Sequence, residues 1–232
     1  MNKPRTFYGK GIPGVATGDL KGKLIVIEGP DGSGRSTQIG LLTEWLERRG
    51  HAVEHVGLKR STLVSEELER AQNGNILSRI TLSLFYATDF ADQLEHRILP
   101  ALRAGFIVLA DRYIYTLMAR DIVRGADLPW LQSVYSIALV PDLVLYLRVA
   151  PQKLMERNIY RGRELDYWES GMDIGYNRSW YDSFNRYQSE LHRTFSKLQA
   201  IYGFATINGM KVPRAVTRDL QARIEAVISP DG

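Results

Sequence analysis

The 232-residue sequence predicts an α/β fold, with a parallel sheet that helices cover on both faces. Apolar runs of strand length alternate with segments of helical periodicity along most of the chain. A glycine-rich segment joins the first apolar run to the first helix, which is where a phosphate-binding loop is expected. Because no internal repeat or low-complexity segment interrupts this alternation, we expect a single domain over residues 22–232.

The apolar runs and the residues between them predict the order of the elements. The expected strands are residues 23–28, about 51–57, 106–110, 142–149 and 204–207. The expected helices are 36–49, 61–71, about 75–103, about 115–123, 129–139, one beginning near 151, 177–202 and 212–228. We expect Asn73-Gly74 to break the second helix, Asn75 to cap the third and Pro100 to kink or divide its end. The apolar stripe of the third helix is Ile76, Ile80, Leu84 and Ala87.

Composition limits the class of protein. The chain has a net charge of +4, with 44% hydrophobic and 24% charged residues, as is typical of soluble globular proteins. The lack of cysteine excludes disulfides and thiolate chemistry and fits a cytoplasmic location. No apolar run reaches the roughly 20 residues of a membrane span. Residues 1–21 lack the apolar segment of a signal peptide and are expected to form an irregular arm.

Residues 29–37 read G-P-D-G-S-G-R-S-T, which is close to the phosphate-binding pattern G-x-x-x-x-G-K-[ST]. The amides of such a loop and the N-terminus of the following helix attract phosphate. The residues expected to bind it are Gly29, Gly32, Ser33, Gly34, Arg35, Ser36 and Thr37. Ser36 would also supply a hydroxyl to Mg²⁺, and Arg35 replaces the usual lysine with a bulkier, forked cation. The alternative is a glycine-rich turn without function.

Asp111 and Arg112 follow the apolar run 106–110 directly. Ligands of open parallel sheets bind at the carboxyl ends of the strands, so this pair is expected in the same layer as the glycine-rich loop. Asp111 is suited to hold Mg²⁺ or one of its waters, and Arg112 to bind a second phosphate. The alternative is a strand-end turn in which the aspartate caps the next helix.

An arginine-bearing lid is expected at about residues 157–173. Arg157 and Arg161 lie four residues apart on one helix face, and Lys153 precedes them on the same face. Phosphoryl transfer depends on positioning and on positive charge around the transferring group, and a mobile basic lid supplies both. The alternative is a solvated helix whose charges pair with Glu156, Glu164 and Asp166.

Asp31 lies inside the glycine-rich loop, where a carboxylate is not needed to hold phosphate. It can accept a hydrogen bond from a sugar hydroxyl of a second substrate. It can also simply order the loop through an Asx turn. The first role is favoured slightly.

These features together resemble the thymidylate kinase family of nucleoside monophosphate kinases over residues 23–228. The shared segments are Ile27-Glu28-Gly29-x-Asp31-Gly32-Ser33-Gly34-x-Ser36-Thr37-Gln38, Leu84-Phe85-Tyr86-Ala87, Asp111-Arg112-Tyr113, Pro141-Asp142-Leu143, Arg161-Gly162-x-x-Leu165-Asp166 and Phe184-Asn185-Arg186-Tyr187. The set and its order are fairly specific, although no single segment is.

The resemblance implies a three-layer P-loop kinase fold with a five-stranded parallel sheet, a Mg·ATP donor and a deoxynucleoside monophosphate acceptor, first of all dTMP. By position, Asp31 would contact the acceptor sugar, Arg112 its phosphate and Phe85 the acceptor. Arg157 would lie near the adenine, and Arg161 near the transferring phosphates. Arg35, Arg112 and Arg161 are thus the expected catalytic residues. A homodimer is also implied.

Several positions differ from the family pattern on the acceptor side. The family's arginine that reads the thymine edge corresponds to Phe90, which can stack on a base but cannot donate a hydrogen bond. The family's Tyr-Gln near the base reads Arg120-Asp121, and the turn after the second strand reads 59–62, K-R-S-T. Losing a base-edge hydrogen bond weakens discrimination by orders of magnitude. Alternatives are therefore another phosphorylated acceptor, or a nucleotide-binding protein without catalysis. Nucleic-acid binding is disfavoured because no recognition element is found.

Overall fold

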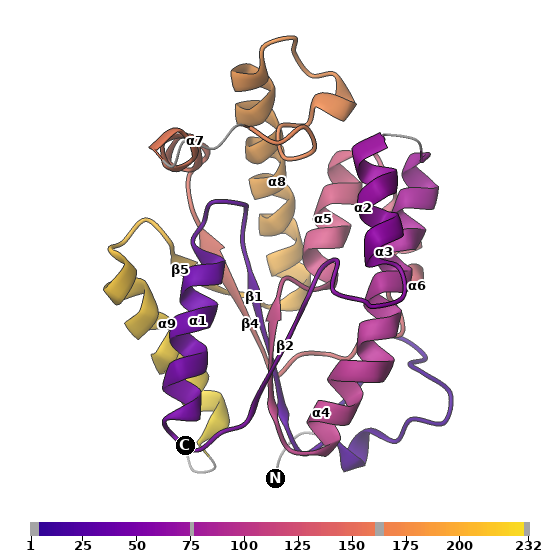
Figure 1. Ribbon diagram of the computed structural model, residues 1–232, viewed down its shortest axis with the longest axis vertical. Helices are drawn as coiled ribbons and strands as arrows, with labels where there is room; N and C mark the ends of the chain where they lie inside the picture. Colours follow the sequence, from indigo (N-terminus) through magenta and orange to yellow (C-terminus); the bar gives the residue numbers. More distant parts are fainter. Residues whose placement is uncertain (1–4, 75–76, 161–164, 230–232) are drawn as a thin grey trace.

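The computed structural model describes residues 5–74, 77–160 and 165–229, excepting the side chains of residues 72–74. Its centre is a five-stranded parallel sheet of order β2-β3-β1-β4-β5 (Figure 1). The strands are β1 (Lys23–Glu28), β2 (Val53–Gly57), β3 (Ile107–Asp111), β4 (Leu143–Arg148) and β5 (Ala205–Asn208). The predicted α/β fold with a five-stranded parallel sheet is therefore confirmed.

Helices form a layer on each face of this sheet (Figure 1). They are α1 (Arg35–Glu47), α2 (Ser65–Gly74), α3 (Arg79–Gln93), α4 (Leu99–Arg103), α5 (Ile114–Val123), α6 (Leu128–Val134), α7 (Pro151–Tyr160), α8 (Trp180–Tyr202) and α9 (Pro213–Ile228). A π-helical turn at Leu94–Ile98 joins α3 to α4, and 3-10 turns lie at Thr17–Asp19 and Met172–Ile174. Helices α1 and α9 bury Leu42 and Leu220 against Ile25 of one face. Helices α3, α5 and α8 cover the other.

The register of the central strands places the functional loops. Strand β1 is buried from Leu24 onward and pairs with both β3 and β4, so it is the middle of the sheet. Ile27 lies opposite Asp111, so the glycine-rich loop after β1 and the turn after β3 emerge side by side. The predicted layer of ligand-binding loops therefore has its expected place at the carboxyl ends of the strands.

The region between β2 and β3 differs most from expectation. Helix α2 begins at Ser65 and continues through Asn73-Gly74, which do not break it. Helix α3 begins at Arg79, and the hydroxyl of Ser78 accepts a hydrogen bond from Thr81 N as its N-cap. The proposed cap Asn75 and the first stripe residue Ile76 lie outside the described residues. Pro100 lies in the first turn of α4, and a π-helical turn rather than the proline separates α3 from α4.

Of the apolar stripe predicted for this helix, Ile80 and Leu84 face outward, and Ala87 packs half-buried against the core. Ile80 is 64% exposed and Leu84 46% exposed. The buried face instead carries Ser83, Asp89 and Phe90. Polar residues are tolerated there because they have partners: Ser83 donates to Asp121 at 2.5 Å, and Asp89 accepts from the loop after β2. The 3.6-residue period was correct, but hydrophobicity alone selected the wrong face.

The amino-terminal arm packs against the domain. Phe7 forms an isolated bridge with Leu139, and Arg5 forms a 2.7 Å ion pair with Asp142 at the start of β4. The Tyr8 hydroxyl contacts the Tyr115 hydroxyl of α5, and burial raises the pKa of Tyr8 to about 12. The described part of the arm thus packs against the first turn of α5 and against the segment that leads into β4. Among the described helices, none has both the length and the hydrophobicity needed to cross a bilayer.

Candidate active site

The loop after β1 has the backbone that phosphate binding requires. Gly32 and Gly34 have φ of 78° and 97°, in the left-handed region that favours glycine. A Cβ at Gly29 would lie 3.0 Å from the carbonyl oxygen of Leu147, so a side chain there would press against β4. A cavity of about 620 Å³ lies over the loop. It is lined by residues 30–37 together with Asn158, Asp166 and Glu169.

Arg35, at the usual lysine position, folds back under the loop. Its Nη1 donates to the carbonyl oxygens of Gly29 and, at 2.8 Å, of Pro30. Its Nε donates to Asp111 at 2.8 Å, and its Nη2 lies 3.5 Å from Asp31. Burial alone would lower the pKa of Arg35, but the two carboxylates outweigh it and raise it. The forked guanidinium therefore joins four groups, which the single ammonium of lysine cannot span in the same way.

Ser36 and Asp111 are the expected Mg²⁺ ligands. Ser36 is exposed at the first turn of α1 and lines the 620 Å³ cavity. Asp111 accepts from Arg35, and its second oxygen lies 3.9 Å from Arg60. The described residues contain no group of three side chains that would hold a metal by themselves. This fits Mg²⁺ bound mainly by phosphates and water, with one or two protein oxygens.

Asp31 is bound by two arginines from the β3–α5 region. Nη2 of Arg112 contacts Oδ1 of Asp31, and Nη2 of Arg120 lies 3.0 Å from Oδ2. The Arg112 and Arg120 side chains are only 13% and 20% exposed. Burial alone would raise the pKa of Asp31, but Arg112, Arg120 and Arg35 together hold it well below its usual value. Asp31 is therefore a carboxylate at neutral pH.

Glu28 holds the turn that carries Arg112, and sequence reasoning gave it no role of its own. This buried carboxyl group accepts from Tyr113 N at 2.9 Å and from the Thr116 hydroxyl at 2.5 Å. Burial raises its pKa to about 7 despite these hydrogen bonds. Arg112 itself has φ of 72°, a left-handed conformation that is uncommon for a side chain of this size. The anchored turn keeps this strained residue directed at Asp31.

Glu169 from the lid segment also reaches Asp31. Burial, and then the charge of Asp31 and a hydrogen bond to it, raise the pKa of Glu169 to about 8. The raised pKa favours the protonated form of the Glu169 carboxyl group beside the Asp31 carboxylate. Asp166 orders the preceding turn by accepting from Trp168 N and Glu169 N at 2.9 Å. The sequence offered no signal for Glu169 beyond its place in a charged segment.

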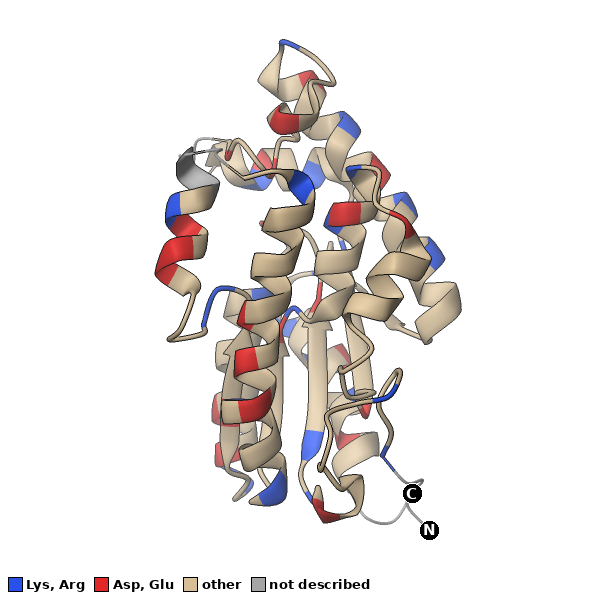
Figure 2. Ribbon diagram, turned by 90° about the vertical axis from the view of Figure 1, so that its right-hand side faces the viewer, with Lys and Arg blue, Asp and Glu red and all other residues tan. Residues whose placement is uncertain are grey.

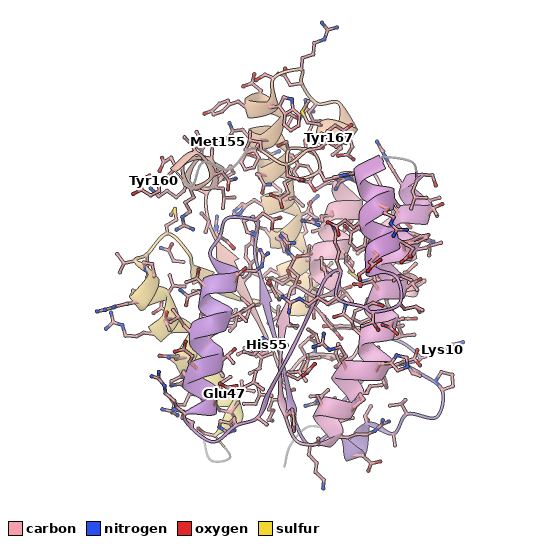
Figure 3. The ribbon with its side chains drawn as sticks, viewed as in Figure 1. Lys10, Glu47, His55, Met155, Tyr160 and Tyr167 are labelled. Atoms are coloured by element: carbon pink, nitrogen blue, oxygen red, sulfur yellow. The ribbon has the colours of Figure 1, made fainter. Side chains whose placement is uncertain are left out.

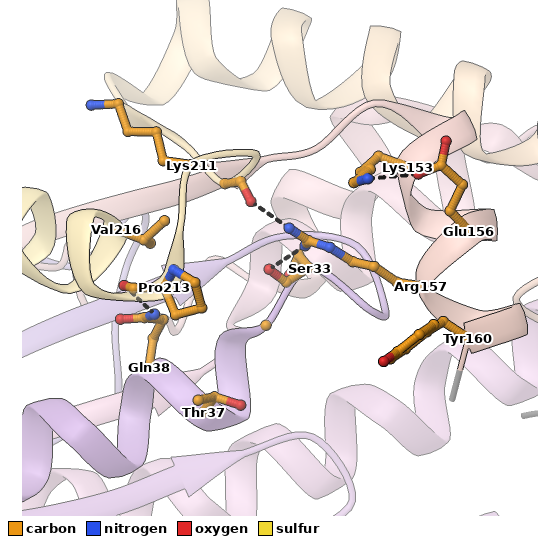
Figure 4. Close-up of a pocket in the computed structure, with 12 residues that line it drawn as sticks. Ser33, Thr37, Gln38, Lys153, Glu156, Arg157, Tyr160, Lys211, Pro213 and Val216 are labelled. Atoms are coloured by element: carbon orange, nitrogen blue, oxygen red, sulfur yellow. Dashed lines mark hydrogen bonds and ion pairs between the residues drawn. The ribbon is translucent and has the colours of Figure 1, made fainter. Parts of the chain in front are cut away.

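Helix α7, whose last residues belong to the predicted lid, is tied to the loop through Arg157. Its Nη1 donates to the carbonyl oxygens of Gly32 at 3.2 Å and Ser33 at 3.1 Å, and its Nη2 donates to Gly209 at 2.8 Å (Figure 4). Lys153, on the predicted cationic stripe, instead pairs with Glu156 at 2.6 Å, as the solvated-helix alternative anticipated. Arg161, the predicted transfer-assisting residue, lies outside the described residues.

A second large cavity, of about 560 Å³, lies between α7, the loop and the start of α9 (Figure 4). Thr37, Gln38, Tyr160 and Val216 are among the residues that line it. Met155, Tyr160 and Tyr167 all lie at this end of the molecule, beyond the carboxyl ends of the strands (Figure 3). The 93% exposed ring of Tyr160 offers a flat apolar surface at the mouth of this cavity.

The predicted acceptor residues on α3 are not all at the site. Phe90 is 5% exposed, and its ring packs edge-on against Tyr113 at 5.1 Å and Tyr135 at 6.0 Å in the core. Phe85 is half-buried against the same core. The predicted stacking of Phe90 on a base is thus not available in this conformation. Its neighbour Asp89 serves the fold, accepting from Lys59 N and Ser61 N at 2.9 Å.

A small cavity of about 30 Å³ lies between α3, α5 and the lid. It is lined by Leu82, Tyr86, Leu117, Arg120, Asp121, Arg124 and Trp168. Of these, only Arg120 was singled out for binding from the sequence. Arg124 could have been found from its spacing, because it lies one turn beyond Arg120 on α5. Trp168 could not, because only tertiary structure brings the lid segment to α5.

Comparison with known proteins agrees with this architecture. A family model described as thymidylate kinase matches residues 27–195. The chain is 37% identical over 203 residues to a probable thymidylate kinase 2 of Saccharolobus solfataricus, covering 87% of this chain and 95% of that protein. It is 30% identical over 213 residues to a probable thymidylate kinase of Pyrococcus abyssi, covering 89% and 97%. It is 34% identical over 157 residues to a thymidylate kinase of Thermoanaerobacter sp., covering 65% and 76%. The chain belongs to the thymidylate kinase family, as its motifs predicted.

Proposed function

We propose that this member of the family transfers the γ-phosphoryl group of ATP to dTMP, giving ADP and dTDP. The observation that carries the proposal is the joining of two phosphate-binding features by one carboxylate. Asp31 belongs to the glycine-rich loop and is bound by Arg112, which follows β3. A donor phosphate on the loop and an acceptor phosphate at Arg112 would therefore be neighbours, as direct in-line transfer requires.

On the donor side, the amides of residues 32–36 bind the phosphates of ATP, with Ser33 and Thr37 beside them. Arg157 lies where the 560 Å³ cavity meets the loop, and the adenine occupies that cavity. Ser36 and Asp111 would hold Mg²⁺, which neutralises charge on the donor phosphates when it is bound. Arg35 supplies positive charge from beneath the loop.

On the acceptor side, Arg112 binds the phosphate, Asp31 faces the sugar hydroxyl, and Arg120 and Phe85 complete the site. The small cavity beside Tyr86 and Asp121 takes the base. During transfer, Arg35, Arg112 and the lid residue Arg161 stabilise the charge on the moving phosphoryl group. The attack of the acceptor phosphate oxygen needs no phosphoenzyme, because the two phosphates face each other directly.

A coupled assay of ADP release over a panel of nucleoside monophosphates tests this function. We expect the highest kcat/KM with dTMP. A higher kcat/KM with another monophosphate would support the alternative of a different acceptor, which the burial of Phe90 and the acidic Asp121 favour. Tight ATP binding without turnover of any acceptor would support a nucleotide-binding protein without catalysis.

We also propose a cytoplasmic homodimer. The exposed Ile80 and Leu84 on α3 form an apolar strip that a second copy would cover. The mass measured by light scattering should be twice that of the chain, and Leu84→Arg should halve it. A monomeric wild-type protein would contradict the dimer. Figure 2 shows basic and acidic residues interspersed over the face drawn, which does not favour nucleic acid as a partner.

A further inference from the structure

Arg120 reaches further than its sequence context suggested. The family pattern places this residue beside the acceptor base. In the structure its guanidinium reaches past the small base-side cavity to Asp31, and it lines both that cavity and a second one beside Arg112. Arg120 therefore spans the two ends of the acceptor site.

Arg112 and Arg120 hold one carboxylate between them. Each donates one N–H to a different oxygen of Asp31. Asp31 is the only side-chain hydrogen-bond acceptor that either guanidinium has among the described residues, although each guanidinium carries five N–H donors. The buried Nε of Arg112 has no partner within the described part of the chain. Donors are thus in excess, and they converge on an anion.

The charges around Asp31 also favour the binding of an anion. Arg35, Arg112 and Arg120 surround Asp31, and Asp111 offsets the charge of Arg35. Arg112 and Arg120 therefore share one carboxylate, and Glu169 adds no charge while it keeps its proton. Lys59 lies close enough to Arg112 and Arg120 for their charges to lower its pKa, to which burial contributes most. Burial and the neighbouring Arg35 likewise lower the pKa of Arg112. A phosphate dianion would relieve this excess more fully than one carboxylate does.

The acceptor end is also closed. The cavity beside Arg112, Arg120 and Asp31 measures about 10 Å³ and the base-side cavity about 30 Å³. Small-molecule sites usually measure about 300–1,000 Å³. Asp31 also lines the 620 Å³ cavity over the loop, so the narrow part lies between Asp31 and the two arginines. A nucleotide fits there only if the contacts of Asp31 with Arg112 and Arg120 open.

We propose that Arg120 is the second phosphate-binding residue of the acceptor site, and that Asp31 occupies the phosphate position in the unliganded protein. This inference rests on the proposed function. When the acceptor binds, Arg112 and Arg120 exchange the carboxylate for the acceptor phosphate, and Asp31 becomes free to face the sugar hydroxyl. The exchange makes the phosphate group, rather than the base, the main source of acceptor affinity.

The ratio of the Kd of thymidine to the Kd of dTMP measures the phosphate contribution alone, because contacts to base and sugar cancel. We expect Arg120→Gln to lower this ratio about ten- to a hundredfold while the Kd of thymidine stays within about threefold. Asp31→Asn removes the competing carboxylate and should raise the ratio. Arg193→Gln makes the same change at an exposed arginine of α8 and should leave the ratio unchanged.

If Arg120 has a purely structural role, Arg120→Gln will weaken the binding of dTMP and of thymidine equally. That result would overturn the inference. An unchanged ratio in Arg120→Gln, or a lowered one in Asp31→Asn, would do the same. If Arg120→Gln does not fold, Arg120→Lys keeps the charge and loses the fork, and its ratio should fall less than tenfold but measurably. No fall in its ratio would then count against Arg120.

The same measurements distinguish a failure of the proposed function from a failure of this inference. If the wild-type protein turns over another monophosphate instead of dTMP, that monophosphate and its nucleoside form the test pair, and the same ratios apply. If dTMP is turned over but the ratio does not respond to Arg120, only the inference is wrong. If no monophosphate binds, both are wrong.

Discussion

The donor and acceptor halves of the site are built differently. The donor half has two cavities of about 560 and 620 Å³, already large enough for a nucleotide. The acceptor half has cavities of about 30 and 10 Å³. The phosphate-binding part of the donor half is the glycine-rich loop, whose backbone lies between strand β1 and helix α1. The acceptor half is lined by charged side chains that bind one another.

This difference indicates which half of the site must change its contacts when a substrate binds. Backbone donors point in one direction whether or not phosphate is present, so the donor half is preformed. Arginine and aspartate side chains can exchange partners, so the acceptor half satisfies its own charges until an acceptor replaces one of them. Arg35 lies between the donor and acceptor halves, because it binds loop carbonyls on one side and Asp31 and Asp111 on the other.

Arg112→Ala should have the largest effect on the acceptor half while leaving the donor half intact. The substitution leaves Asp31 without one of its buried cations and the acceptor phosphate without its main partner. Losing a buried, hydrogen-bonded charge partner costs about 4 kcal/mol, or about a thousandfold in kcat/KM for the acceptor. Equilibrium titration of ATP should show a Kd within about threefold of the wild-type value. A comparable loss of ATP affinity would mean that the two halves are not independent.

Arg35→Lys tests the boundary between the halves. A lysine ammonium cannot keep both the Asp111 contact and the two loop carbonyls, so we expect a loss of about 2 kcal/mol. For a chain of this length, that corresponds to a Tm about 4–8 °C lower, measured by thermal melting. ADP release should persist, because the positive charge is kept. An unchanged Tm would show that the observed fork contributes nothing to stability.

Arg157→Ala weakens the donor half alone. The side chain donates to backbone carbonyls of the loop and of Gly209, and charged hydrogen bonds of this kind contribute about 1.5 kcal/mol each. We expect the KM for ATP to rise about tenfold and the KM for the acceptor to stay unchanged in steady-state kinetics. Gln152→Ala, an exposed change on the same helix outside the lining of the cavity, serves as the control. If both KM values rise together, α7 acts on the acceptor half as well.

Glu169→Gln tests the acceptor half through the pH dependence of its stability. The pKa of Glu169 is raised from its ordinary value of 4.5 to about 8, so its stabilising contribution is complete below pH 4.5 and is lost as the pH rises through 8. The groups that face it are Asp31, Arg112 and Arg120. Each pKa unit corresponds to about 1.4 kcal/mol, or a Tm change of about 3–5 °C.

We therefore expect the Tm of the wild-type protein to fall, relative to Glu169→Gln, by at least about 3–5 °C between pH 5 and 9. Glu156→Gln, an exposed change on α7, should show no such pH-dependent difference. Parallel curves for the wild type and Glu169→Gln would mean that Glu169 is ionised throughout this range.

The sequence could predict local features whose signal lies within a few residues. The strand before the glycine-rich loop was found with its ends, and the other strands to within two residues, because buried parallel strands are continuous apolar runs. The loop itself was found because its glycines, Ser36 and Thr37 are adjacent in the chain. Arg112 was found because it directly follows a strand, and strand ends share one edge of the sheet.

The sequence could not predict the contacts that cross the fold. Tyr86 and Trp168 line one cavity although 82 positions separate them in the chain, and no periodicity connects them. The outward position of Ile80 and Leu84 was missed because polar residues on the opposite face are satisfied by partners from the loop after β2 and from α5.

The sequence by itself determined the parallel sheet, the phosphate loop and the family. These depend on chain-local patterns, which follow from backbone geometry and from the burial of apolar runs. Only the tertiary structure decided that Arg120 would reach Asp31 and that the pKa of Glu169 would be raised beside it. Both features depend on how burial and charges from distant parts of the chain combine at one point. Neither the burial of a residue nor its distance from those charges can be read from the order of residues along the chain.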